Sequence, residues 1–335
     1  MPASAAKRLL DHYDSHHRLL PWRSSPGAPP SAPYVVWLSE VMLQQTTVAT
    51  VIPRFRRFIA RWPSVEALAS APSEEVLSEW AGLGYYARAR NFHACAQEVA
   101  ERGSFPSTEA ELRKLPGLGA YTAAAIAAIA FGERATVIDT NVERVIARLY
   151  GIDRPIANAR SEVRSFAEAF TPANRAGDHA QAMMDLGATI CRPRNPDCTA
   201  CPLSFDCAAF ASGDPEAFPA PKARRNRPHR HGIAWWIERG GAVWLVRRPE
   251  RGLLGGMAAL PGPEWSDEPP AVPTIAAVAH GFTHFTLDLH LVARAGAPPG
   301  DGWWQPLHLL NEAGLPTLYR RAAEAVLTRR DILAA

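Results

Sequence analysis

Four of the five cysteines of this 335-residue chain crowd into one short stretch. The fifth, Cys95, stands far from them. Thiolates at such close spacing, with no histidine among them, can close around either a zinc ion or a cubane iron–sulfur cluster. In a reducing compartment the pattern indicates metal rather than disulfides. The residues therefore predict a metal site, with its occupant left open, at Cys191, Cys198, Cys201 and Cys207.

A second candidate for chemistry is Glu40, which lies in the apolar segment WLSEVMLQQT at residues 37–46. Partial desolvation there would raise the pKa of its carboxyl group, so that it could donate a proton near neutral pH. Gln44 and Gln45 follow at the expected helix end, where their amides could contact a base or fill a gap in a base stack. In a simpler interpretation, Ser39, Glu40 and Gln44 are the solvated face of an amphipathic helix.

The segment from Leu115 to Tyr150 predicts a helix, a tight hairpin and a further helix. Its hairpin, LPGLG, precedes an alanine-rich run with strong helix propensity. Gly117 and Gly119 are expected to adopt backbone conformations closed to other residues. The free N–H groups at the start of the following helix could then hold a phosphate. An ordinary helix connection would explain the same residues.

Asp139 follows the alanine-rich helix. Thr140 and Glu143 fit a capping box that opens the next helix, which would leave Asp139 free for other work. Cleavage of a glycosidic bond requires an acid for the leaving group and an anion that faces the cationic sugar. Glu40 and Asp139 are candidates for that pair if the fold brings them together. The alternative is that Asp139 is a solvated turn residue.

A fourth motif, GLGYYARARN at residues 82–91, places two tyrosines after a glycine turn and two arginines behind them. Stacking rings beside phosphate-binding cations suit an unstacked nucleic acid strand. Tyrosines at a helix start can equally belong to a core.

Composition and charge allow these functions without requiring them. A chain with 47% hydrophobic residues can bury large cores, and its length favours two or three domains. The formal net charge of +3 permits a nucleic-acid partner. We see no signal peptide and no apolar run approaching the roughly 18 residues of a membrane span, so we expect a soluble, cytoplasmic protein.

The chain divides by composition near Asp214. Helical segments separated by proline and glycine precede this point, so the first two-thirds should be all-α. A proline-rich basic linker follows, and then a separate α+β module of about a hundred residues, an ordinary domain size. In that module we expect a hairpin in which Ile233–Ile237 pairs with Ala242–Val246. We also expect a third strand at Phe285–Val292 and a last helix at Thr317–Leu327.

Taken together, these residues resemble the helix-hairpin-helix DNA glycosylase superfamily, and within it the adenine-specific, mismatch-directed MutY family. The resemblance covers nearly the whole chain. Beside the cysteine set, the matching segments are LPWR at 20–23, WLSEVMLQQT at 37–46, GLGYYARARN at 82–91, LPGLGAYTA at 115–123, VIDTNVERV at 137–145, QAMMDLGA at 181–188 and FTHF at 282–285.

The resemblance implies two helical subdomains with the active cleft between them, and a [4Fe-4S] cluster on the four cysteines. Residues 1–29 and 136–213 would form the iron–sulfur subdomain, and residues 30–135 the helical barrel with the hairpin. Residues 214–231 would be the linker and residues 232–335 a Nudix-like domain.

The resemblance also implies roles for individual residues. Glu40 would protonate the adenine ring and Asp139 would stabilise the oxocarbenium-like sugar, with Asn141 and Tyr121 positioning the reacting nucleotide. Adenine would be flipped out of the duplex. Arg23 and Gln181 would line the adenine pocket, and Gln45 and Tyr85 would enter the base stack that the adenine leaves. Leu115, Gly117 and Gly119 would contact the DNA backbone.

Two departures from related patterns refine the prediction. Bifunctional relatives carry a Schiff-base lysine where this chain has Tyr121, so we expect base removal without efficient strand cleavage. Nudix hydrolases need several glutamates for magnesium, which the segment from Leu260 to His280 lacks, so we expect no nucleotide hydrolysis. In the family this domain reads 8-oxoguanine through a Phe-Ser-His loop, matched here by Phe282, Thr283 and His284.

The sequence thus predicts a monomeric, monofunctional adenine DNA glycosylase. It would act on double-stranded DNA that contains adenine opposite 8-oxoguanine or guanine. The alternatives are an endonuclease III-like glycosylase/lyase for oxidised pyrimidines and a non-catalytic iron–sulfur DNA-binding protein.

Overall fold

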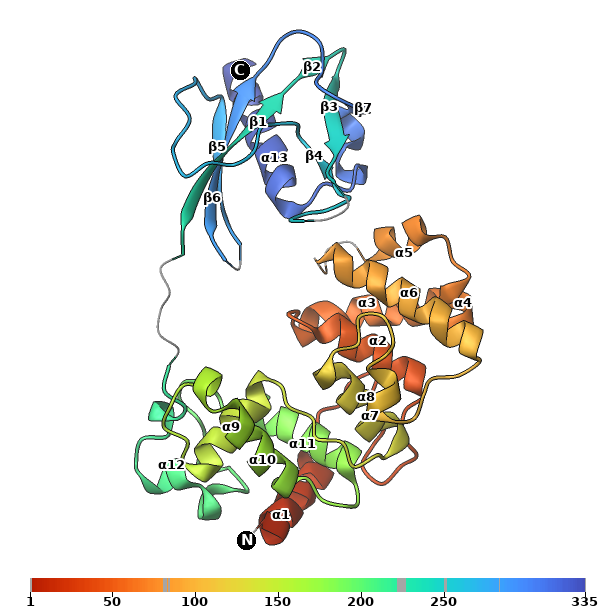
Figure 1. The fold of residues 1–335 in the computed structure, drawn as a ribbon, viewed down its shortest axis with the longest axis vertical. Helices are drawn as coiled ribbons and strands as arrows, with labels where there is room; N and C mark the ends of the chain where they lie inside the picture. The colour runs from red at the N-terminus through yellow and green to blue at the C-terminus, as the bar shows by residue number, and fades with distance from the viewer. Residues whose placement is uncertain are drawn as a thin grey trace. The chain divides into compact units, whose positions relative to one another are not determined.

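The computed structural model describes residues 2–80, 83, 85–221, 227–249, 252–282 and 284–334. The chain groups into two compact units, one holding residues 1–83 and 88–223 and the other residues 84–87 and 224–335. Figure 1 shows that the first unit is built from helices and that the second combines strands with a long helix.

The first unit is all-α, as the sequence predicts: no strand occurs among its described residues. No helix of the described chain combines the length and the apolar content that crossing a bilayer would need. The α-helices of this unit are α1 (Pro2–His16), α2 (Pro33–Leu43), α3 (Val48–Arg61), α4 (Val65–Ala69), α5 (Ser73–Glu79), α6 (Tyr86–Arg102), α7 (Glu109–Leu112), α8 (Ala120–Phe131), α9 (Thr140–Tyr150), α10 (Arg160–Phe170), α11 (Ala176–Thr189) and α12 (Ala208–Ala211). Short 3-10 turns lie at Ile156–Asn158, Ser204–Asp206 and Pro215–Ala217.

One core of this unit is aromatic and lies among helices α2 to α8. Trp37 on α2 stacks on Phe92 of α6 with ring centroids 4.2 Å apart, and Phe58 and Trp80 meet the same cluster edge-on. Helix α2 is apolar on nearly every side, so it is buried nearly all round. The alanines of α8 allow its neighbours α2 and α11 to pack closely against it.

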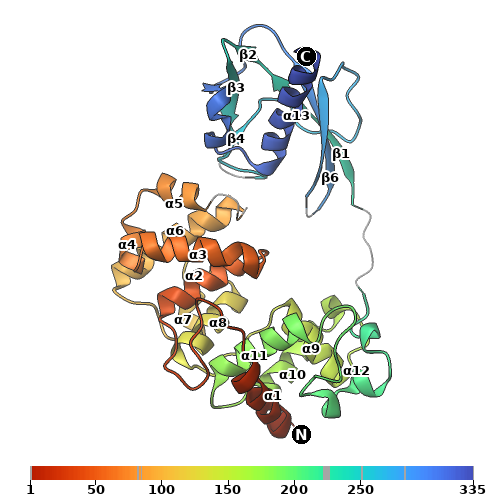
Figure 2. The same cartoon turned by 180° about the vertical axis from the view of Figure 1, so that it is seen from behind.

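A second core brings the N-terminus of the chain against helices from its middle. Leu9 and Tyr13 on α1 are buried with Ile146 of α9, Phe170 of α10 and Leu186 of α11. Figure 2 shows α1 beside α10 and α11, although more than a hundred residues separate them in the sequence.

Helix α11 joins the two cores, and glycine makes its close packing possible. A Cβ atom on Gly177 would lie 2.6 Å from the carbonyl oxygen of Ala128 on α8. A Cβ atom on Gly187 would lie 2.6 Å from the Cβ atom of Asn141 on α9. The first contact fixes α11 against α8, and the second fixes it against the start of α9.

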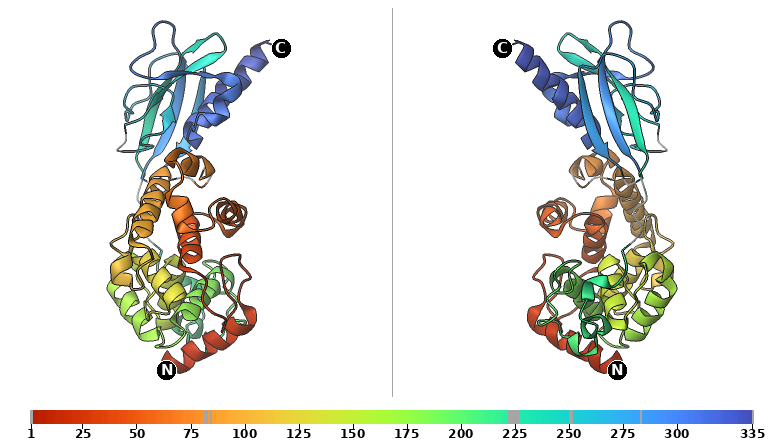
Figure 3. Two further views of the ribbon diagram at one scale, coloured as in Figure 1. Left: turned by 90° about the vertical axis from the view of Figure 1, so that its right-hand side faces the viewer. Right: turned by 90° about the vertical axis from the view of Figure 1, so that its left-hand side faces the viewer.

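The second unit is α+β, also as predicted. A three-stranded sheet has the order β1-β6-β5, with β1 parallel to β6 and β5 antiparallel to it. A second sheet has the order β2-β3-β4, with β7 paired to β3. Helix α13 packs against β5 and β6, as the side views of Figure 3 show. The elements are β1 (His229–Trp236), β2 (Glu238–Arg239), β3 (Ala242–Arg247), β4 (Ala258–Ala259), β5 (Ala276–Gly281), β6 (Thr286–Ala293), β7 (Trp303–Pro306), a 3-10 turn (Leu307–Glu312) and α13 (Thr317–Ala334).

The three predicted strands correspond to β1, β3 and β6, whereas β2, β4, β5 and β7 were not predicted. A hairpin turn does occur at Gly240 and Gly241, but the expected pairing of Ile233–Ile237 with Ala242–Val246 is wrong. Strand β1 pairs along its whole length with β6 instead of with β3, and only the short β2 folds back on β3. The alternation of β6 explains the preference, because Leu287, Leu289 and Leu291 bring a continuous apolar face to the core that Ala234 and Trp236 of β1 also line. The last helix extends beyond the predicted Leu327.

We predict that Gly177→Ala lowers the free energy of unfolding of the first unit by about 1–3 kcal/mol, because the added methyl overpacks the crossing of α8 and α11. Urea unfolding followed by far-UV circular dichroism measures the change. Ala188→Ser, on an exposed position of the same helix, is the control and should shift stability by less than about 0.5 kcal/mol. An unchanged midpoint for Gly177→Ala would contradict the close-packing argument.

Candidate active site

Glu40 is a carboxylic acid inside the apolar helix α2. It is 5% exposed and its neighbour Ser39 is 1% exposed, so the interpretation of this segment as a solvated face is wrong. Burial raises the pKa of Glu40, and the negative charge of Asp139 raises it further. A hydrogen bond from Tyr121 and the charge of Arg23 act in the opposite direction. Desolvation is the largest of these effects, so the neutral acid is favoured.

Tyr121 connects Glu40 to the junction of the two cores. Its hydroxyl donates to Glu40 Oε2 at 2.7 Å and lies 3.4 Å from the sulfur of Met184 on α11. Burial, followed by the charge of Glu40, holds the pKa of Tyr121 well above its ordinary value. The phenol therefore remains a neutral hydrogen-bond donor at the point where α2, α8 and α11 meet.

Asp139 caps helix α9, which corrects the sequence prediction. Its Oδ1 accepts from the backbone N–H of Val142 at 2.7 Å, so the expected capping box of Thr140 and Glu143, with Asp139 left free, is wrong. Asn141 Nδ2 donates to the other oxygen, Oδ2, at 3.1 Å. Two donors at the start of α9 thus hold this carboxylate in a fixed orientation.

The structure brings the two carboxylates into electrostatic contact. Glu40 comes from the aromatic core and Asp139 from the start of a helix in the second core, yet the charge of Asp139 raises the pKa of both Glu40 and Tyr121. Burial favours the neutral acid at Glu40, and Asp139 acts on it as a negative charge. This division is what acid-assisted cleavage of a glycosidic bond requires.

Arg23 is bonded to α11, the helix that carries Gln181. Arg23 Nη1 donates to Asp185 Oδ2 at 2.6 Å, and both side chains are almost fully buried. Gln181 is buried one turn before Asp185 and three residues before Met184, so it lies on the face of α11 that reaches Tyr121. Asp185 was not predicted as a site residue, although it lies inside the matching segment QAMMDLGA.

Gln45 and Tyr85 both have left-handed backbones, with φ of 57° and 51°. Each is exposed, with Tyr85 at 58%. Arg88 joins the two loops, because its Nη2 donates to Leu83 O at 2.9 Å and its Nη1 to Gln44 O. Arg88 is one of the two arginines predicted to bind phosphate, and this internal role was not predicted from the sequence.

The hairpin before α8 has one special glycine instead of two. Gly117 has φ of +74° and packs so closely on Asn91 that a Cβ atom would lie 2.8 Å from the Cβ of that residue. Gly119 is extended, with φ of −78°, so the expected special conformation is wrong there. Leu115 is buried beneath the turn. No side chain caps α8 at Gly119, so its first N–H groups remain available to an external acceptor such as a phosphate.

The four clustered cysteines lie in and beside the loop that follows α11. None forms a disulfide. Burial, and after it the charges of the other three cysteines, raises the pKa of Cys201 to about 12. Thiolates that are partly buried and repel one another need a compensating cation, which is the environment that a metal or cluster would relieve.

Two arginines on α9, which the sequence analysis also missed, connect the cysteine segment to the carboxylate site. Arg144 donates to Asn141 Oδ1 at 2.9 Å, to Gly187 O at 2.7 Å and to Cys191 O at 2.9 Å. Arg148 approaches Cys191 Sγ at 3.4 Å and donates to the carbonyl groups of the next two residues. The only sequence feature that could have indicated these contacts is that the two arginines lie one helical turn apart.

In the second unit, the loop between β5 and β6 carries the predicted recognition residues. Phe282 is held in an aromatic cluster, with its ring centroid 4.7 Å from that of Phe285 and 5.7 Å from that of Trp265. His284 is exposed. Residues of the predicted motifs that lie outside the described residues are Gly82, Gly84 and Thr283.

Two family models match the chain. Residues 38–172 match the HhH-GPD superfamily base excision DNA repair protein, and residues 233–325 match the NUDIX domain. The first match spans Glu40, Tyr121 and Asp139, and the second begins within β1.

Full-length relatives and solved structures agree with these matches. Adenine DNA glycosylase from Mus musculus is 33% identical over 88% of this chain and 72% of its own length. Adenine DNA glycosylase from Buchnera aphidicola subsp. Schizaphis graminum (strain Sg) is 30% identical over 94% and 96%. A thermostable thymine-DNA glycosylase structure is 28% identical, with a TM-score of 0.56, over 63% of this chain and 97% of that one.

These relatives extend over both units, and the family model for base excision repair spans the two carboxylates and the tyrosine that the fold brings together. The chain therefore belongs to the adenine DNA glycosylase family of base excision repair enzymes.

Proposed function

We propose that the enzyme removes adenine from double-stranded DNA where adenine is paired with 8-oxoguanine or guanine. The observation that carries the proposal is the buried hydrogen bond between Glu40 and Tyr121 beside the charge of Asp139. An endonuclease III-like lyase would need an amine at position 121, and a purely DNA-binding protein would have no use for a neutral acid facing an anion.

In the proposed reaction Glu40 protonates the adenine ring. The electron pair of the N-glycosidic bond leaves with the base, and the sugar becomes an oxocarbenium-like cation. Tyr121 holds Oε2 of Glu40, so Oε1 is left to carry the acidic proton. After proton transfer, the Glu40 carboxylate can accept a proton from the water that attacks the sugar carbon.

Asp139 would face the cationic sugar. Its charge is stabilised by the first turn of α9 and oriented by Asn141 before the substrate arrives. An anion held in place in this way stabilises developing positive charge without reorganising in the transition state. Arg144 in turn orients the Asn141 amide, which makes it a positioning residue.

The remaining candidate residues supply binding in this proposal. Arg23 and Gln181 would line the adenine pocket, and Gln45 and Tyr85 would enter the space that the flipped adenine leaves. The uncapped start of α8 after Leu115, Gly117 and Gly119 would hold a DNA phosphate. The enzyme would act as a monomer.

We also propose the domain boundaries and the cofactor that the resemblance implies. The boundaries are residues 1–29 with 136–213 for the cluster subdomain, 30–135 for the helical barrel, 214–231 for the linker and 232–335 for the Nudix-like domain. The cofactor would be a [4Fe-4S] cluster, which would supply structural cross-linking of the cysteine loop.

The central test is a single-turnover assay on a duplex with adenine opposite 8-oxoguanine, with and without alkali. We expect adenine release from the wild type and strand breaks only after alkali. Glu40→Gln should lower the rate by about 10²- to 10⁴-fold, the usual worth of a general acid. Glu101→Gln, at an exposed position on α6, should leave the rate unchanged. Activity of Glu40→Gln equal to wild type, or strand scission that keeps pace before alkali, would contradict the proposal.

The stability of Glu40→Gln provides the control for folding. Because burial raises the pKa of Glu40, its stabilising contribution is fully present below the unfolded pKa and is lost as pH rises through the folded one. Each unit by which the folded pKa exceeds the unfolded pKa corresponds to about 1.4 kcal/mol in the free energy of unfolding. The glutamine variant should thus be at least as stable as wild type at pH 8 in urea unfolding. The rate of the wild type should also fall as pH rises through the raised pKa, since the acid loses its proton.

The cofactor is tested by iron and sulfide analysis of freshly purified protein. We expect about four iron and four sulfide atoms per chain. Cys198→Ser should lose most of the iron, whereas Cys95→Ala, which alters the cysteine outside the set, should retain it. Stoichiometric zinc without iron would overturn the assignment.

The recognition loop is tested by His284→Ala. We expect the preference for adenine opposite 8-oxoguanine over adenine opposite guanine to fall about tenfold, as for the loss of one hydrogen bond. His308→Ala, an exposed histidine of the same unit, should keep the preference. If both variants discriminate like wild type, Phe282, Thr283 and His284 are not the reading loop.

A further inference from the structure

Three of the eleven histidines of the chain lie on two neighbouring strands of the second unit. His229 and His231 lie on β1, and His290 lies on β6 with Asp288. In the parallel register His231 is directly opposite Asp288. Because alternate residues of a strand point to the same face, these four side chains share the face opposite the leucines of the core.

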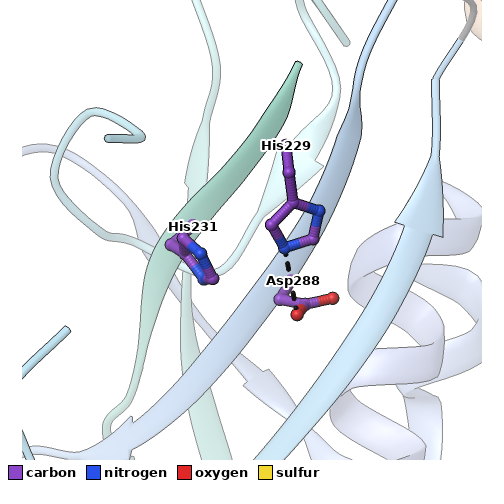
Figure 4. A group of neighbouring side chains, drawn as sticks. All are labelled: His229, His231 and Asp288. Atoms are coloured by element: carbon purple, nitrogen blue, oxygen red, sulfur yellow. Dashed lines mark hydrogen bonds and ion pairs between the residues drawn. The ribbon is translucent and has the colours of Figure 1, made fainter. Parts of the chain in front are cut away.

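Two imidazoles and one carboxylate of this set converge (Figure 4). One ligand atom from each of His229, His231 and Asp288 lies within 4.8 Å of the other two. His229 Nε2 is already 3.2 Å from Asp288 Oδ2. Ligands about 2.1 Å from a tetrahedral zinc ion lie about 3.4 Å apart, so small side-chain rotations would close the remaining gap.

A hydrogen bond outside this trio orients one of the imidazoles. His229 Nδ1 lies 2.8 Å from Thr286 Oγ1, the residue opposite it on β6, so the ring turns its Nε2 toward Asp288. Metal-binding histidines are typically held in this way through their second nitrogen. His231 Nδ1 lies 3.4 Å from His290 Nε2, which gives the second ring a polar neighbour on the same strand face.

The surroundings leave space for an ion and for further ligands. Across β6 the neighbouring strand β5 presents Ala279 opposite Asp288 and Ala277 opposite His290, both exposed and both too short to cover the face. Side chains of this set are partly exposed, with His229 at 46% and Asp288 at 39%. A cation could therefore enter and keep water in its remaining coordination positions.

We propose that His229, His231 and Asp288 form a binding site for a divalent transition metal, with Zn²⁺ as the ion that the ligand set fits. Two nitrogens and one oxygen with an open fourth position are typical of zinc sites with three protein ligands. Magnesium and calcium prefer oxygen ligands only, so neither suits this trio.

The position of the site gives it a structural role. His229 is the first residue of β1 and thus the point where the chain enters the sheet, and Asp288 lies near the start of β6, just after the loop of Phe282 to His284. A bound ion would hold the start of β1 against β6, next to that loop. The site shares no residue with the cysteine set or with the carboxylate pair, so it does not rest on the proposed function.

The test is calorimetric titration of Zn²⁺ into the full-length protein after EDTA dialysis, with zinc and iron analysis of the product. Wild type should bind one zinc ion more than the double variant His229→Asn/His231→Asn, and Mg²⁺ should give no binding. His308→Asn, on the 3-10 turn of the same unit, should behave as wild type. The comparison cancels any zinc held by the cysteines, because all variants keep them.

Two milder variants guard against misfolding of the double variant. Asp288→Asn keeps the shape of the side chain and should weaken zinc binding at least tenfold. Thr286→Val removes only the hydroxyl that orients His229 and should weaken it about 10- to 100-fold. Addition of Zn²⁺ to wild type should also shift the imidazole NMR signals of His229 and His231 and leave that of His308 in place. Equal zinc stoichiometry in wild type and the double variant, or unshifted signals, would overturn the site.

Discussion

Burial of the Glu40 carboxyl group is the constraint on which the active site depends. A protein interior tolerates such a group only if it is neutral or well partnered. Here Tyr121 supplies one hydrogen bond, and the negative charge of Asp139 opposes ionisation. The position is thus unfavourable for the anion and favourable for the acid. Helix α8 delivers the tyrosine, and its small alanines let α2 and α11 approach closely enough for the three helices to meet there.

The second carboxylate, Asp139, lies at the start of a helix instead of inside an apolar helix. Asp139 accepts a hydrogen bond from the first turn of α9, and Asn141, which donates to its other oxygen, is itself held by Arg144. Arg144 also binds the carbonyl groups of Gly187 and Cys191. The start of α9 is therefore fixed from the cysteine segment. A metal centre at those cysteines would act on the reaction through the geometry of this connection, without contacting the substrate.

The fold class could be predicted from the sequence, because helix propensity, proline and glycine breaks and the later alternation in β6 are local signals. The pairing of β1 with β6 could not, since a strand does not encode which edge it joins. The same division holds in the site. Glu40 and Asp139 could be selected as candidates from their residue types, but the capping role of Asp139 was misread because Thr140 and Glu143 offered an equally good local motif. Arg88, Arg144, Arg148 and Asp185 were missed because each acts through contacts with backbone or side chains distant in the sequence.

The second unit matches the NUDIX domain, although the sequence predicts no nucleotide hydrolysis for it. The described residues between Leu260 and Ala276 form no helix, and few carboxylates occur there. A sheet needs only its core face to fold, so its outer face can acquire new side chains without loss of stability. The outer face of β1 and β6 carries His229, His231 and Asp288. The proposed metal site would thus use strand positions that the core leaves unconstrained.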